Sequence, residues 1–457
     1  MHRQRSRTIP AILLFLALPG PAALAADPPA TAPKTIVRSF EHVVMKGEAL
    51  PANLGQPIPL MRLYALREGK MQPVPYQVDE ITEDGTWVLP SQSPYLSRKQ
   101  AGKMVMAVDE PPDILDDNDE LAFMMADTGD RAPPSAWPPG VLRSDEITLT
   151  DPLTGGQGWG YLFSFPTPVE PSSVDYVEYR FRQDTTADLI HSDLFTLHFS
   201  HEVPITWDAI TFDDGVNIID RMKIRLHCRL FHLFTIDKNE THLNSQLWQF
   251  KDGPVRVIRR VRSSVKLVAK LKSPSVNSET LYYRNAVLLP FRVKIPFTPK
   301  GIVSDLYFEG GPDFRDLYGW KLRLNTDDRW LQVDGHTDEV EATIRADGAK
   351  WFILKGPGKA MLYDLTLVNE KEVGLRRRFH YLDDAVQANP PEFHPGQVPY
   401  IGYFVDGIGD VKGGSVFRFH VLAFFLDRDY SEAELVDTMK IYENPIRAEV
   451  KPPAEGG

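Results

Sequence analysis

The sequence predicts an all-β protein made of antiparallel β-sandwich domains, with a short C-terminal α-helix. Apolar and polar residues alternate over strand-length runs, as in Met-Lys-Ile-Arg-Leu-His at residues 222–227. Asp-Gly pairs at residues 214–215, 252–253 and 347–348 are typical of hairpin turns between such runs. The pattern lacks the helices that would connect parallel strands, so antiparallel sandwiches are favoured over a doubly wound fold.

Residues 1–25 have the pattern of a cleavable secretory signal peptide. Three arginines precede an apolar run at residues 11–18, and Ala-Leu-Ala at residues 23–25 provides a small-residue cleavage site. The apolar run is shorter than the roughly 20 residues that cross a bilayer. We therefore expect cleavage before Ala26, a periplasmic or extracellular protein, and no membrane span in the mature chain.

Composition then divides the exported chain. Residues 26–34 are rich in Pro and Ala and predict a flexible lead-in. Short apolar runs predict an N-terminal β-sandwich domain over residues 35–166, and a proline cluster at residues 166–171 predicts the boundary after it. Residues 175–447 predict a larger, supersandwich-like domain that includes the helix, and residues 448–457 predict a disordered tail.

One helix is predicted near the C-terminus. Ser431 and Glu434 have the spacing of a capping box, and apolar residues follow at helical intervals. Pro445 ends the pattern, because proline cannot continue a helix.

Charge and cysteine content limit the partners and cofactors. The formal net charge of −11 argues against nucleic acid as a partner, since phosphate backbones attract basic proteins. Cys228 is the only cysteine, so an internal disulfide, a haem attachment motif and a cysteine-rich zinc site are excluded. It lies in a strand-like run and is expected to be a buried packing residue. Apart from calcium, no cofactor is expected.

An acidic segment at residues 109–120 contains seven carboxylates just before a predicted strand. Oxygen-rich loops of this kind hold calcium. The EF-hand pattern fails, because Leu121 stands where that loop requires glycine. The alternative is a solvated turn whose aspartates bond their own backbone. The candidate calcium ligands are Asp113, Asp116, Asp117 and Asp119.

A basic, strand-like stripe interrupts the otherwise acidic chain between residues 256 and 272. Period-two alternation would place several of its cations on one sheet face. Arginine suits carboxylates and sulfates, so Arg256, Arg259 and Arg262 are candidate ligands of an anionic glycan. The alternatives are a solvent-facing strand and a sheet edge protected by charge.

Aromatic and polar residues surround the stripe. Trp207, Trp248 and Asn285 are further candidate ligands, because ring faces pack on apolar sugar faces while polar groups fix orientation. The same region could catalyse β-elimination on a uronate. In that case Arg284 or Asn285 would neutralise the carboxylate, His242 or His201 would remove the neighbouring proton, and Tyr283 would protonate the leaving oxygen.

Short motifs carry a resemblance to known classes. Residues 73–80 (Pro-Val-Pro-Tyr-Gln-Val-Asp-Glu) and 119–123 (Asp-Glu-Leu-Ala-Phe) resemble the opening of some uncharacterised secreted bacterial β-sandwich proteins of polysaccharide-degrading systems. Residues 253–256 (Gly-Pro-Val-Arg) are similar to a strand entry in the galactose-mutarotase-like supersandwich class. The resemblance implies a β fold and a glycan partner, and it supplies no catalytic residue.

Three functional hypotheses follow. The leading one is recognition of an anionic polysaccharide, uronate or sulfated, by a basic and aromatic-flanked sheet face. The second is a polysaccharide lyase that acts on the same ligands. The third is a structural or assembly component of the bacterial envelope, in which the basic stripe meets an acidic envelope protein.

Overall fold

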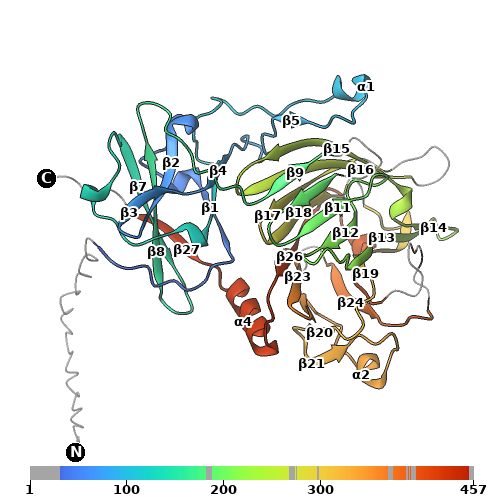
Figure 1. The fold of residues 1–457 in the computed structure, drawn as a ribbon. Helices are drawn as coiled ribbons and strands as arrows, with labels where there is room; N and C mark the ends of the chain where they lie inside the picture. Colours follow the sequence, from blue (N-terminus) through green and yellow to red (C-terminus); the bar gives the residue numbers. More distant parts are fainter. Residues whose placement is uncertain are drawn as a thin grey trace, which may run out of the picture.

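The structure is a computed structural model, and its main secondary structure is antiparallel β-sheet (Figure 1). It describes residues 31–181, 188–266, 273, 275–295, 298–368, 374–387, 390, 392 and 398–451. The predicted signal peptide and most of the predicted lead-in lie outside these residues. The all-β prediction is confirmed.

The N-terminal unit packs two sheets around one core. The first sheet has the order β1 (His42–Lys46), β6 (Glu120–Met124), β4 (Tyr76–Asp79). The second has the order β27 (Arg447–Lys451), β7 (Arg143–Thr150), β8 (Gln157–Ser164), β2 (Met61–Arg67), β3 (Lys70–Pro73). Alternate side chains such as Leu63, Leu121 and Leu162 fill the space between them.

The C-terminal strand β27 returns to this unit. It pairs with β7, and Ala448 and Val450 pack against the N-terminal core. Figure 1 shows β27 in red beside the blue and green strands of the N-terminal unit. The expected tail from residue 448 therefore continues as a strand to Lys451. Its partner β7 is remote from it in sequence, which is why local composition alone did not predict it.

The larger unit is a sandwich of a ten-stranded and a five-stranded sheet, with a four-stranded sheet beside them. The ten-stranded order is β21 (Asp327–Gln332), β20 (Lys321–Leu324), β22 (Trp351–Gly356), β23 (Lys359–Leu367), β26 (Val416–Leu426), β18 (Ala286–Lys294), β17 (Val276–Tyr283), β16 (Arg256–Val265), β15 (Leu243–Asp252), β5 (Ser91–Gln92). The five-stranded order is β14 (Phe234–Lys238), β13 (Ile219–Leu230), β19 (Val303–Phe314), β25 (Tyr400–Asp406), β24 (Arg376–Leu382). The four-stranded order is β12 (Trp207–Thr211), β11 (Thr196–Phe199), β10 (Leu189–His191), β9 (Glu178–Arg180).

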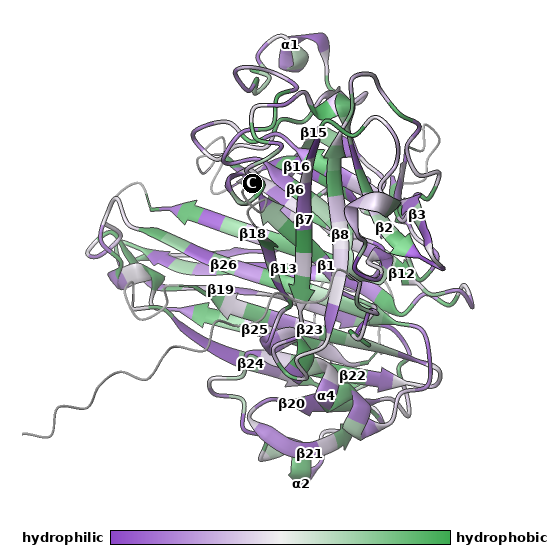
Figure 2. Cartoon of the chain, turned by 90° about the vertical axis from the view of Figure 1, so that its left-hand side faces the viewer, coloured by the Kyte–Doolittle hydropathy of each residue, from purple (hydrophilic) through white to green (hydrophobic). Residues whose placement is uncertain are grey.

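All three sheets contribute to one large hydrophobic core, with Leu197, Val257 and Ile401 among its members. Figure 2 shows hydrophilic and hydrophobic residues alternating along strands such as β26 and β19. Cys228 is buried and unpaired on β13, as predicted, and burial raises the pKa of its thiol.

The helices are short. The α-helices are α1 (Arg98–Ala101), α2 (Glu339–Ala342) and α4 (Glu432–Glu443), and the 3-10 turns are η1 (Gly47–Ala49), η2 (Ile58–Leu60), η3 (Met125–Asp127), η4 (Pro134–Ala136), η5 (Glu240–His242) and η6 (Ile408–Asp410). Helix α4 confirms the predicted C-terminal helix, and its capping box is complete. Leu435 and Met439 anchor α4 in a second core cluster beside the ten-stranded sheet. Within the described ranges, no helix is long and apolar enough to cross a membrane.

Candidate functional site

Arg256, the first residue of the predicted stripe, lies in a buried ion network between the two units. Its guanidinium donates to Asp79 (Nε to Oδ2, 2.7 Å), Glu120 (Nη2 to Oε2, 2.7 Å) and the hydroxyl of Tyr283 (Nη1 to O, 3.0 Å). Only 1% of the Arg256 surface is exposed. The Tyr283 ring stacks on His42, with 3.7 Å between ring centroids. Arg256 and Tyr283 therefore join β16 and β17 to the N-terminal unit instead of facing solvent.

Electrostatics in this network favour the charged arginine. Burial alone would raise the pKa of Asp79 and Glu120, but the charge of Arg256, a neighbouring lysine and side-chain hydrogen bonds together outweigh burial and lower both pKa values. Burial and the same charge lower the pKa of His42 to about 3, so His42 is neutral at physiological pH. The network contains a neutral imidazole and two carboxylates that share one guanidinium.

The other two candidate arginines of the stripe lie on two different faces. Arg259 points to the opposite side of the sheet, where its guanidinium lies 3.4 Å from the ring centre of Phe199 and is buried. Trp207 is buried in the same core. Arg262 is exposed, and its guanidinium lies 4.7 Å from the ring centre of Trp248. Successive strand residues alternate in direction, and both faces of β16 are covered near Arg256, so residues 256–266 of the stripe form no single cationic groove. Residues 267–272 of the stripe lie outside the described residues.

The predicted lyase residues are also separated. Asn285 is buried and its amide donates to the Phe40 carbonyl, while Arg284 forms a bidentate ion pair with Asp193. His242 is the last residue of η5, and its ring hydrogen-bonds to the Asn239 side chain. It directly precedes β15, at the end of the β15–β16 hairpin that lies opposite the turn. That end lies roughly 30 Å along β16 from Arg256, at about 3.3 Å per residue. Tyr283 and Arg284 thus have no access to His242 as a shared proton acceptor.

The fold brings only some of the predicted calcium ligands of the acidic loop close together. Asp116 and Asp119 converge with Asp109, each with a carboxylate oxygen within 4.8 Å of the others. Asp113 and Asp117 are exposed, and neither belongs to this group.

A polar face that the sequence analysis did not identify lies on the outer side of the five-stranded sheet. In antiparallel pairs, directly opposite residues share a face. Three such pairs join β13 to β19: Lys223 with Gly311, Arg225 with Glu309, and His227 with Tyr307. The same face continues through Phe404 and Gly402 on β25 to Arg378 and His380 on β24. We call this surface the outer face.

Tyr400 occupies the centre of the buried end of the outer face. Its side chain lies across Gly402, where an added Cβ would come within 2.3 Å of the Tyr400 hydroxyl, so this position requires glycine. The ammonium of Lys223 and the guanidinium of Arg225 lie 5.8 Å and 5.6 Å from the Tyr400 ring centre. The His380 ring meets Tyr400 edge to face at 5.3 Å.

Glu309 and His380 form a hydrogen-bonded acid–base pair beside Tyr400. Nδ1 of His380 lies 2.5 Å from Oε1 of Glu309, and 43% of the His380 side chain is exposed. Burial alone would raise the pKa of Glu309, but the hydrogen bond from His380 and nearby cations outweigh burial and lower it. Burial and the charge of Glu309 raise the pKa of Tyr400 well above its usual value, so its phenol stays protonated. A carboxylate that orients an accessible imidazole is an arrangement that supports general base catalysis.

Deeper in the face, Lys223 neutralises two acids. Its ammonium contacts Asp313 and lies 2.7 Å from Glu392. Burial raises the pKa of Asp313, although the charge of Lys223 opposes that effect. Lys223 therefore takes the position between these carboxylates that a bound cation would otherwise hold.

An aromatic platform lies at the open end of the outer face. Tyr307 and Phe404 stack with 4.3 Å between ring centroids, and His227 stacks on Tyr307 at 4.9 Å. The guanidinium of Arg378 lies 4.8 Å from the ring centre of Phe404. Tyr307 and Phe404 are half-buried and Arg378 is exposed, so ring surface and positive charge are both accessible here. Such a surface combines apolar contact area with a planar anion-binding group.

Part of this face could have been found in the sequence. The alternation at residues 222–227 correctly predicts a strand that carries Lys223, Arg225 and His227 on one side. Glu309 and His380 are remote from it in sequence and occur in no motif. Strand order alone brings them together.

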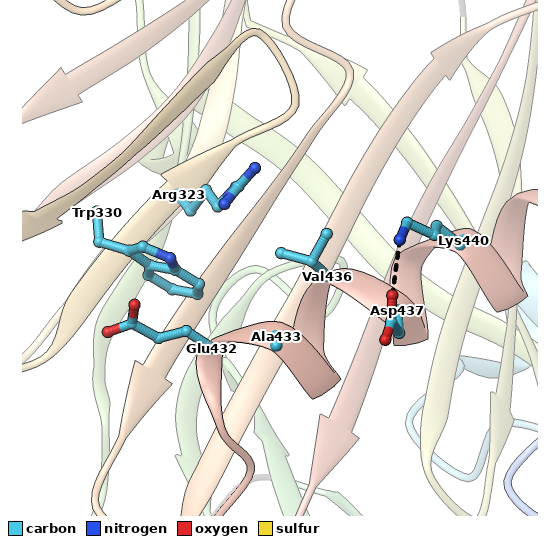
Figure 3. Close-up of a pocket in the computed structure, with 7 residues that line it drawn as sticks. All are labelled: Arg323, Trp330, Glu432, Ala433, Val436, Asp437 and Lys440. Carbon is cyan, nitrogen blue, oxygen red and sulfur yellow. Dashed lines mark hydrogen bonds and ion pairs between the residues drawn. The ribbon is translucent and has the colours of Figure 1, made fainter.

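Two surface hollows lie elsewhere and share no residue with the outer face. One lies between α4 and the β20–β21 hairpin, where Trp330 and Arg323 face the helix (Figure 3). Its cations are paired, Arg323 with Asp328 at 2.6 Å and Lys440 with Asp437 at 2.7 Å. The other is lined by residues 172–175 and 252–254. Neither hollow is lined by a histidine, so neither contains a histidine–carboxylate pair like that of the outer face.

No protein-family model and no curated protein matches the chain significantly. Two solved structures from Enterococcus faecalis are similar. An α-mannosidase has 8% identity and a TM-score of 0.42 over 93% of this chain and 45% of its own. A glycosyl hydrolase family 38 protein has 9% identity and a TM-score of 0.45 over 94% of this chain and 48% of its own. The chain spans less than half the length of these proteins, and neither is described as a member of the two classes that the sequence resembles.

Proposed function

We propose that this is an exported protein that binds an anionic polysaccharide, uronate or sulfated, on the outer face. The observation that carries the proposal is the half-exposed Tyr307–Phe404 stack with the Arg378 guanidinium over the Phe404 ring. The half-exposed rings offer apolar contact area to a sugar, and the guanidinium fork pairs with carboxylates and sulfates. The outer face replaces the β16 stripe as the proposed binding surface, because Arg256 and Arg259 are buried.

Replacing Arg378 with alanine is expected to weaken binding of an anionic polysaccharide by at least about fivefold, since one charge-assisted contact contributes about 1–3 kcal/mol. The salt dependence of polysaccharide binding should also decrease in this variant. Calorimetric titration of a panel of uronate and sulfated polysaccharides at two salt concentrations measures both effects. Arg262→Ala is the matched control, because it removes a similar cation–aromatic contact from another sheet.

Unchanged affinity in Arg378→Ala would reject the outer face as the binding surface. If no polysaccharide in the panel binds the wild-type protein, the third hypothesis gains support, namely a structural or assembly component that meets an acidic envelope protein.

The Glu309–His380 pair favours β-elimination as a second candidate function. His380 would accept the proton from the carbon beside the uronate carboxylate, and Glu309 would hold the imidazole in place. The ring C–H and glycosidic C–O bonds break, a C=C bond forms, and His380 passes the proton to the leaving oxygen. Arg378 lies two residues from His380 on the same face and would neutralise the carboxylate.

Export yields a separate prediction. The purified mature protein is expected to begin at Ala26, because the peptidase site follows Ala23-Leu24-Ala25. N-terminal sequencing of protein from the periplasm or medium measures this directly. A variant lacking residues 2–25 should remain in the cytoplasm, and recovery of uncleaved protein outside the cytoplasm would contradict the signal peptide.

A further inference from the structure

Three aspartates converge in the loop that leads into β6. Asp109, Asp116 and Asp119 each place one carboxylate oxygen within 4.8 Å of the others. Asp109 is 5% exposed, Asp119 is fully buried, and Asp116 is half-buried. Unlike the predicted set, this group includes Asp109 and leaves out the exposed Asp113 and Asp117.

The side chain of Asp109 supplies independent evidence for a ligand. Its Oδ2 is buried and has no hydrogen-bond partner among the described residues. A buried carboxylate oxygen without a partner is costly unless a cation or a donor meets it. Asp119 is held in place, because its Oδ1 accepts from the Ile81 amide and its Oδ2 from the Asp116 amide, both at 3.0 Å.

The charged neighbours of these buried groups are acidic. After burial, the main charges that raise the pKa of Asp109 belong to Asp116, Glu110 and Glu83. Burial, with a smaller contribution from the charges of Asp116 and Asp109, raises the pKa of Asp119 to about 6. In the described part of the chain, no ion pair neutralises the three aspartates. The cluster thus differs from the Lys223 site, where an ammonium neutralises the acids.

We propose that Asp109, Asp116 and Asp119 hold a divalent cation, and that calcium is the preferred one. Carboxylate oxygens are hard ligands, and calcium accepts six to eight of them in irregular geometry. Magnesium demands a near-octahedral shell and retains several waters, which a largely buried group of protein oxygens suits less well.

The position of the site gives the cation a structural role. Asp119 directly precedes Glu120, and Ile81 follows two residues after Asp79, so the site lies next to both acids that bind Arg256. The backbone carbonyl of Asp119 also accepts from the Gly47 amide at 2.9 Å. A bound cation fixes the ends of β4 and β6 that hold Arg256, and it therefore stabilises the junction between the two units.

Calorimetric titration and thermal unfolding of the full mature protein test the site. After treatment with a chelator and removal of the chelator, calcium chloride is expected to bind with a saturable heat and to raise the Tm by at least about 2 °C. Magnesium chloride should have a smaller effect at the same concentration. No polysaccharide is present, so the result is independent of the proposed function.

Asp109→Asn should abolish the calcium response and leave the Tm without calcium unchanged or higher, because it removes an unneutralised buried charge. Asp117→Asn is the matched control, since this exposed acid of the same loop is outside the cluster and the response should remain. Asp116→Asn, at a half-buried position, provides a second test if Asp109→Asn does not fold. The proposal fails if millimolar calcium gives neither a binding heat nor a Tm shift in the wild-type protein. It also fails if the Asp109→Asn variant shows the same calcium response as the wild-type protein. A magnesium response as strong as that of calcium would overturn the choice of ion.

Discussion

Replacing Arg256 with alanine is expected to lower the free energy of unfolding by about 3 kcal/mol, the lower end of the range for breaking a buried ion pair, because it removes the guanidinium that pairs with both Asp79 and Glu120. Asp79 is 1% exposed, and the Glu120 side chain is 14% exposed. Lys251 also pairs with Asp79 and Lys46 with Glu120, so part of each acid's stabilisation remains. Denaturant unfolding at neutral pH measures the loss.

Two further variants test the cause of this loss. Arg256→Lys should recover only a fraction, because one ammonium cannot reproduce three contacts from a planar guanidinium. Arg262→Ala, on the same strand but exposed, should cost less than about 1 kcal/mol. Similar losses of unfolding free energy for Arg256→Ala and Arg262→Ala would show that the Arg256 network does not stabilise the junction between the two units.

If a uronate polysaccharide is cleaved, His380→Ala is expected to lower the turnover number by about 10²- to 10⁴-fold, the contribution of a positioned general base. The imidazole is the exposed member of the Glu309–His380 pair, so its loss removes the proton acceptor without opening the core. Ultraviolet absorbance of the unsaturated product measures the rate.

His242→Ala is the control for this experiment. His242 binds Asn239 at the end of the β15–β16 hairpin, and its removal should leave turnover unchanged. Glu309→Gln should lower kcat more than it changes KM, because Glu309 positions His380 and does not meet the substrate. Equal losses of turnover in His380→Ala and His242→Ala would show that the reaction does not take place at the Glu309–His380 pair.

The β16 stripe shows why a correct local pattern led to a different surface. Period-two alternation predicts that Arg256 and Arg259 point to opposite faces, and they do. Alternation does not reveal what covers each face. Here the N-terminal unit covers one face and the four-stranded sheet, through Phe199, covers the other, so both arginines are buried.

The acidic loop was predictable in part for a related reason. Asp116 and Asp119 were expected to be ligands because they lie in a dense acidic segment. Asp109 was outside the predicted set, since only the folded loop turns its side chain back toward them.

The sequence by itself determined the antiparallel strands, the buried cysteine and the capped helix α4, because alternation and capping depend on neighbours in the chain. Only the tertiary structure decided where β27 pairs, which arginines are buried, and that Glu309, His380 and Arg378 share a face with Lys223. The physical reason is that side-chain exposure and electrostatic environment depend on strand order and on the layer that packs on each face. Strand order and layer packing are both determined by contacts between segments that are distant in sequence.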